Sequence, residues 1–197
     1  MNATRNLKND HITIRRVKDI AQKCSDRLYA DRYVPIEDVE IISVIIEEFV
    51  DHFHHGKEEK AYFPDTKEKN GFAEDIRKFL IEHELGRRIA IMLRRELNEV
   101  KEKRKEQSKH KTNKQDPINM EPIARFLKSY AVFIDDHTAK EDRFFDLVDE
   151  KNVITNEEDE MLLKHYEMCK NQAGGEIRIQ EMVVLIKFLE EREWMKD

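Results

Sequence analysis

Four histidines occupy similar settings in four different amphipathic segments of the chain. They are His11, His54, His83 and His137. Each continues the apolar stripe of its segment, because residues three, four, seven and eight apart share one face of an α-helix. If the four segments pack as a bundle, each would point one imidazole inward, where its neutral ring nitrogen can bind a transition metal.

Two of these histidines are followed by a glutamate four residues later. The pairs are His54 with Glu58 and His137 with Glu141, and four residues rise about 6 Å, so each pair shares a helix face. A buried carboxylate is costly unless positive charge compensates it, and a second one nearby raises the cost. A pair of cations would supply that compensation. The predicted metal ligands are His11, His54, Glu58, His83, His137 and Glu141.

His55 has the same spacing to Glu59 and competes with His54 as a ligand. Counted back along an α-helix, the face of His55 runs through Asp51 and Glu47, which are polar. We therefore prefer His54, and we expect His55 and Glu59 to face solvent or, at most, to lie behind the ligands.

The segments that must position these residues are long helices. The 197 residues include only 5 Gly and 4 Pro, and 40% of them are charged, a composition that favours amphipathic helices. Apolar residues recur at helical spacing, and no strand pattern is convincing. The expected helices span roughly residues 9–29, 36–64 and 155–171, and three others carry the apolar residues within 72–97, 123–147 and 179–194. Asp116-Pro117 would open the fourth helix. The fold class is therefore all-α: an up-down four-helix bundle over residues 9–150, with additional C-terminal helices in 155–197 packed on it.

Two signals concern segments outside the predicted site. Thr155 and Glu158 have the spacing of a capping box, which would begin the fifth helix. The run from Lys101 to Lys114 is almost wholly charged or polar. It would prolong the third helix as a solvated rod and then become a linker.

Composition excludes several classes of function. The net charge of −6 argues against nucleic-acid binding. The 2 cysteines, Cys24 and Cys169, form no C-x-x-C pattern, which argues against a thiolate metal site or a disulfide framework. Residues 1–8 have no signal-peptide core, and no apolar run approaches membrane-spanning length. We expect a cytoplasmic protein with no membrane and no nucleic-acid partner.

The mixture of nitrogen and oxygen donors narrows the choice of metal ion. Imidazole and carboxylate ligands suit iron, manganese or zinc. Six ligands are too many for one tetrahedral ion, so two ions bridged by the glutamates fit better. Ferritin-like bundles place Glu three residues before His, and no histidine of this chain has Glu at that position.

The order His, His-x-x-x-Glu, His, His-x-x-x-Glu resembles the hemerythrin-like, or HHE cation-binding, family. The motifs that carry the resemblance are Asp10-His11-Ile12, His54-His55-Gly56-Lys57-Glu58-Glu59 with Phe63-Pro64, Glu82-His83-Glu84-Leu85-Gly86-Arg87 and His137-Thr138-Ala139-Lys140-Glu141-Asp142. It covers roughly residues 9–150. It implies a bundle with a non-heme centre of two iron ions (Fe2+/Fe3+), which an oxo or hydroxo group could bridge. It also implies that Glu58 and Glu141 bridge the ions and that the four histidines are terminal ligands.

One departure from the family pattern concerns the third helix. Oxygen carriers of this family have a further histidine where this chain has Arg87, so one iron position would be open to water or a small molecule. Arg87 would either face a bound anion at the site edge or pair on the surface with Glu82 or Glu84. Asp142 competes with Glu141 as the bridge, because oxygen carriers place their carboxylate five residues after the histidine; the repeat between the two His-x-x-x-Glu segments favours Glu141.

The resemblance implies a function in the chemistry of small oxidants. A pair of ferrous ions with an open position can bind dioxygen and pass two electrons to it. We expect binding or sensing of dioxygen, nitric oxide or peroxide, and Tyr130 could hydrogen-bond such a ligand. Two alternatives use the same centre: an enzyme that removes peroxide or nitric oxide, and a protein for iron handling or repair of iron centres. Signal output would use a protein partner or a homodimer formed through the C-terminal helices.

Overall fold

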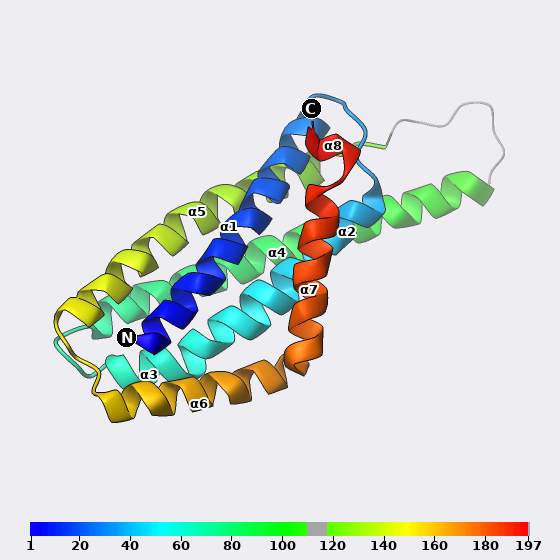
Figure 1. Ribbon diagram of the computed structural model, residues 1–197. Coiled ribbons are helices and arrows are strands. Elements are labelled where there is room, and N and C mark those ends of the chain that lie inside the picture. The colour runs from blue at the N-terminus through cyan, green and yellow to red at the C-terminus, as the bar shows by residue number, and fades with distance from the viewer. Residues whose placement is uncertain (110–117, 197) are drawn as a thin grey trace.

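Four helical segments run antiparallel, side by side, in the computed structural model, which describes residues 1–109 and 118–196 (Figure 1). They are α1 (Asn2–Tyr29), the segment that begins with α2 (Ile36–Ile45) and ends with α3 (Phe63–Thr66), α4 (Ala73–Lys109) and α5 (Glu121–Glu150). No strand is present in the described part of the chain. The predicted all-α, up-down bundle with additional C-terminal helices is confirmed.

The first helix begins earlier than predicted. It starts at Asn2 rather than near residue 9, because the carboxylate of Asp159 accepts hydrogen bonds from the backbone N–H groups of Asn2 (3.2 Å) and Ala3 (2.8 Å). Leu7 is fully buried in the same stretch. A tertiary contact thus satisfies the free amide groups that open this helix.

The second segment changes its backbone pattern where its histidines lie. Between α2 and α3, the stretches η1 (Ile46–His55) and η2 (Glu58–Tyr62) are π-helical. Their backbone bonds join residues five apart, so a turn holds more residues and successive side chains are separated by a smaller rotation. This lets His54 and His55, which are neighbours in sequence, both turn toward the interior.

The C-terminal helices pack along the bundle (Figure 1). Helix α6 (Asn156–Gln172) begins with the predicted capping box, in which Thr155 and Glu158 exchange side-chain to backbone hydrogen bonds. Helices α7 (Gly175–Glu190) and α8 (Glu193–Lys196) follow. Arg178 of α7 donates to both carboxylate oxygens of Glu48, at 2.6 and 2.8 Å. The division into units 9–150 and 155–197 stays a prediction.

Helix α4 runs into the charged segment that was predicted to prolong it. It continues to Lys109 and so includes the first part of the basic run; residues 110–114 and Asp116-Pro117 lie outside the described residues. Within residues 1–109 and 118–196, no helix combines the length and apolar character required to cross a bilayer.

The contact between α8 and α2 gives a stability prediction. Asp38 is 3% exposed, and its Oδ2 accepts hydrogen bonds from Arg192 Nε and Trp194 Nε1, both at 2.7 Å. Asp38→Ala leaves the buried indole N–H without a partner, so we expect a loss of about 2–4 kcal/mol in the free energy of unfolding. Urea denaturation followed by the fluorescence of the single tryptophan measures this loss. The exposed neighbour Glu37 supplies the control, since Glu37→Ala should change the midpoint little; equal midpoints for the two variants would contradict the prediction.

Candidate metal centre

The six predicted ligands meet in the interior of the bundle, and each is at most 1% exposed. With His55 they form two groups of side chains whose ligand atoms lie within 4.8 Å of one another. One group is His11, His54, Glu58 and Glu141, and the other is His55, His83 and His137. Every long segment of the bundle contributes: α1, the π-helical stretches, α4 and α5.

The two carboxylates lie between the two groups. Glu58 Oε1 is 3.3 Å from His54 Nε2, while its Oε2 is 3.4 Å from His83 Nε2. Glu141 Oε1 is 3.3 Å from His83 Nε2, while its Oε2 is 3.4 Å from His11 Nε2 and 3.2 Å from His137 Nε2. Each glutamate therefore faces histidines of both groups, as a carboxylate that bridges two ions must.

The four predicted histidines are held from behind by carboxylates. The distances from Nδ1 to carboxylate oxygen are 2.8 Å for His11 and Asp142, 3.1 Å for His54 and Asp10, 2.7 Å for His83 and Glu59, and 2.8 Å for His137 and Glu82. A carboxylate on Nδ1 fixes the ring orientation and turns Nε2 toward the interior, an arrangement typical of histidines that bind metals. There, Nε2 of His11 and Nε2 of His54 lie 3.0 Å apart. In all four, Nε2 faces at least one of the two glutamates.

The prediction that His55 faces solvent is wrong. His55 is 3% exposed, and its ring stacks on that of His83 with centroids 3.8 Å apart. The prediction assumed α-helical geometry through this segment, whereas the backbone is π-helical at His55. Glu59 lies behind the ligands, where it holds His83; this was the alternative to a solvent-facing position.

The surface pairing predicted for Arg87 is also wrong. Arg87 donates to Asp51 at 2.8 Å and to Glu59 at 2.6 Å, not to Glu82 or Glu84. Its partners are carboxylates that hold His55 and His83 from behind. Arg87 therefore stabilises the outer shell of the site and adds no donor to its interior.

Asp142 and Tyr130 lie next to the centre in different ways. Asp142 binds His11 Nδ1 and Arg15 from outside the cluster, so Glu141 is the carboxylate that faces the interior. The hydroxyl of Tyr130 is buried and has no hydrogen-bond partner, and Tyr130 lines a neighbouring pocket.

Several buried polar atoms of the cluster have no hydrogen-bond partner. They are both carboxylate oxygens of Glu58, Oε2 of Glu141, and Nε2 of His55 and of His137. Buried polar groups in folded proteins are nearly always satisfied, and all of these atoms are lone-pair donors that suit a cation. The residues present therefore fit the two-cation centre implied by the ligand pattern.

The burial of the cluster shifts its titration. Burial lowers the pKa of His83 to about 3, despite the opposing charge of Glu58. Burial also lowers the pKa of His54, but the charges and hydrogen bonds of Glu58 and Asp10 outweigh it and raise that pKa to about 9. Burial raises the pKa of Glu141 well above its usual range, and the charge of Glu58 adds to this effect. In the metal-free protein near pH 7, His54 is therefore protonated on both ring nitrogens, and burial favours the neutral form of Glu141.

Metal binding should consequently release protons. A bound cation must displace the extra proton of His54, so affinity should rise with pH, by up to about tenfold per pH unit, until the pKa of about 9 of His54 is passed. Calorimetric titrations with a divalent ion, in buffers of different ionisation enthalpy, count these protons. An observed heat that does not depend on the buffer would contradict the prediction.

Aromatic rings separate the centre from water. Phe145 stacks on His11 with centroids 5.7 Å apart, and Phe133 stacks on His137 at 5.2 Å. Phe63 lies 5.8 Å from the ring of His83. A dry surrounding of this kind strengthens electrostatic interactions inside the site.

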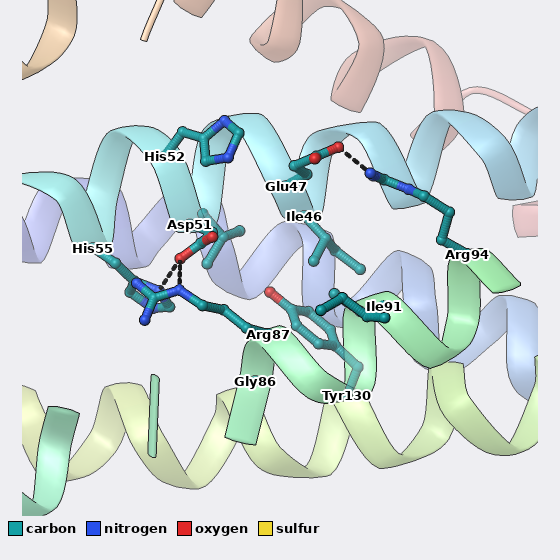
Figure 2. A pocket seen from close by; sticks show the side chains of 12 residues that line it. Ile46, Glu47, Asp51, His52, His55, Gly86, Arg87, Ile91, Arg94 and Tyr130 are labelled. Atoms are coloured by element: carbon teal, nitrogen blue, oxygen red, sulfur yellow. Dashed lines mark hydrogen bonds and ion pairs between the residues drawn. The ribbon is translucent and has the colours of Figure 1, made fainter. Parts of the chain in front are cut away.

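A pocket of about 170 Å³ lies between η1 and α4, beside the second histidine group (Figure 2). His55, Tyr130 and Arg87 line it together with aliphatic side chains such as Ile46 and Ala90. Figure 2 shows Asp51 joined both to His55 and to Arg87 at its edge.

Three of the carboxylates behind the histidines were not predicted. Asp10 and Glu82 precede His11 and His83 in the sequence, yet they hold His54 and His137 on other segments. Asp51 precedes His55 by four residues. Acidic residues next to histidines in the sequence could have indicated that carboxylates hold the imidazoles. The sequence does not indicate which carboxylate holds which histidine across helices.

The fold and the site together define a class: a helical bundle with a buried cluster of histidines and two glutamates that could hold a metal. The sequence profile of the hemerythrin HHE cation-binding domain matches residues 2–114. The chain belongs to this family, which confirms the resemblance. The matched region ends before α5, which supplies His137 and Glu141. Comparisons with curated proteins and with solved structures gave no match.

Proposed function

We propose that this protein binds two iron ions through His11, His54, Glu58, His83, His137 and Glu141, and that the centre binds or senses dioxygen or a related small oxidant. The cluster of buried lone-pair donors without hydrogen-bond partners carries the proposal. Membership of a cation-binding family supports the metal, and the mixed nitrogen and oxygen donors support iron.

When bound, a pair of ferrous ions supplies two electrons and a coordination position for a small oxidant. The chain's own part is to fix the donors. Carboxylates on Nδ1 hold the imidazoles in one orientation, so that little reorganisation accompanies binding. Glu58 and Glu141 place negative charge where the cations would lie.

The surroundings of the centre support a small ligand. The phenylalanine rings that stack on His11, His83 and His137 leave the ligands at most 1% exposed. The adjacent pocket of about 170 Å³ can hold only a few small molecules. The unpartnered hydroxyl of Tyr130 offers one hydrogen bond inside that pocket.

Two measurements test the proposal. The protein is purified without oxygen, reconstituted with ferrous iron and analysed for metal, and visible spectra are then recorded on admission of air. About two irons per chain and a new near-ultraviolet and visible charge-transfer band are expected. A single zinc ion, or no metal after reconstitution, would overturn the proposal. His52→Ala removes an exposed histidine of η1 and should leave the iron count unchanged.

The same samples separate the proposed role from its alternatives. Recovery of the ferrous spectrum under vacuum favours binding or sensing. Consumption of many equivalents of peroxide or nitric oxide favours a detoxifying enzyme, and rapid loss of iron to a chelator favours iron handling or repair. Output through a partner or a second copy stays a prediction; Ile177 and Val184 of α7 are exposed and could contribute to such a contact.

A further inference from the structure

We propose that His55 is a fifth histidine ligand of the centre and binds the same ion as His83 and His137. This inference rests on the proposed metal centre and deepens it. It adds a ligand to the six predicted from the sequence.

His55 is held in the same way as the four predicted histidines. Its Nδ1 faces a carboxylate, Oδ1 of Asp51, at 3.4 Å. All five imidazoles therefore have an acidic partner on Nδ1, with the opposite nitrogen left over. A histidine that merely filled space in the core would have no need of this arrangement.

The other ring nitrogen of His55 faces the interior and lacks a partner. Nε2 of His55 is buried without a hydrogen-bond partner, although the whole side chain is only 3% exposed. It lies within 4.8 Å of ligand atoms of both His83 and His137. Nε2 of His137 is likewise buried without a hydrogen-bond partner, while Nε2 of His83 faces Glu141, and a cation would accept the lone pairs of these imidazoles together.

The backbone at His55 is π-helical. In an α-helix, neighbouring residues point about 100° apart and could not both serve one compact site, whereas the π-helical backbone of η1 reduces that rotation. π-Helical turns are uncommon and are found frequently at functional sites. Here the unusual backbone brings His54 to one group and His55 to the other.

Arg87 explains why a further donor is required. It lies one turn after His83 on α4, but its guanidinium cannot bind a cation and is engaged with Asp51 and Glu59. Arg87 instead fixes Asp51, which in turn holds His55 (Figure 2). His55 therefore adds to this group a nitrogen from η1, beside that of His83 from α4.

The test compares the affinity for ferrous iron and the proton NMR spectrum of the loaded protein for wild type, His55→Ala, Asp51→Asn and His52→Ala. Loss of a ligand should weaken binding at the second group by about 100-fold or more, whereas Asp51→Asn, which alters only a positioning residue, should cost about 10-fold to 100-fold. His52→Ala should match wild type. Because His55 lines the pocket, added imidazole should restore binding to His55→Ala.

The loaded wild type should show five hyperfine-shifted ring N–H signals, one for each histidine whose Nδ1 faces a carboxylate, and His55→Ala should show four. Four signals in both proteins, or equal affinities, would overturn the assignment of His55 while leaving the centre itself intact. Failure of wild type to bind iron would instead overturn the proposed function. A lower midpoint of thermal unfolding for metal-free His55→Ala than for metal-free wild type would identify a folding defect. Added imidazole would not repair such a defect, whereas it should replace a lost ligand.

Discussion

Glu58→Gln is expected to leave the protein folded while reducing bound iron from about two ions per chain to one or fewer. The amide has the shape of the carboxylate but no negative charge, and it directs an N–H donor toward a cation. Both oxygens of Glu58 face the cluster, toward His54 and His83, so neither position of the amide nitrogen avoids this conflict. A carboxylate that serves both groups cannot be lost from one alone.

Metal analysis after anaerobic reconstitution and removal of excess iron measures this effect. Glu59→Gln is the matched control, because Glu59 is the next residue but binds His83 from the outer side and is 26% exposed. It should retain two ions with an affinity reduced about 10-fold to 100-fold. Two tightly held irons in Glu58→Gln would contradict the bridging role of Glu58.

Loading the centre with ferrous iron should raise the midpoint of thermal unfolding by roughly 15 °C or more. Ion binding to the native state alone contributes about 4 kcal/mol per site at a free concentration 1,000 times the dissociation constant. For a chain of this size, each kcal/mol corresponds to about 2–4 °C. The gain is large because the ions satisfy buried atoms that have no hydrogen-bond partner in the metal-free protein, such as both oxygens of Glu58.

Circular dichroism melts under anaerobic conditions, with and without ferrous iron, measure the shift. Glu58→Gln should lose most of it, while His52→Ala should keep it. Magnesium, which prefers all-oxygen ligands, should have little effect. An equal shift with magnesium, or with Glu58→Gln, would show that the ions stabilise the protein from elsewhere on its surface.

Much of this protein could be predicted from the amino-acid order. The α-helical repeat identified the segments of the bundle, and it identified the inward histidines because a side chain that continues an apolar stripe shares its buried face. The spacing of His54 to Glu58 and of His137 to Glu141 placed both carboxylates among the histidines, where the structure has them. The burial cost of two glutamates then pointed to cations. These inferences succeeded because each depends on residues within one or two turns of one helix.

The tertiary structure decided the rest. Asp10 lies beside His11 in the sequence but holds His54, and Glu82 lies beside His83 but holds His137. Such pairings depend on how neighbouring helices face each other, which no periodicity within one helix encodes. The start of α1 likewise depends on Asp159, from a helix more than 150 positions away.

The inward position of His55 required the backbone itself. The printed sequence places His55 on a polar face if the helix is α-helical, and that geometry was the natural expectation. The π-helical hydrogen bonds of η1 rotate His55 into the bundle, where it stacks on His83. A change of this kind is stabilised by packing across helices, so it becomes visible only when the surrounding segments are in place.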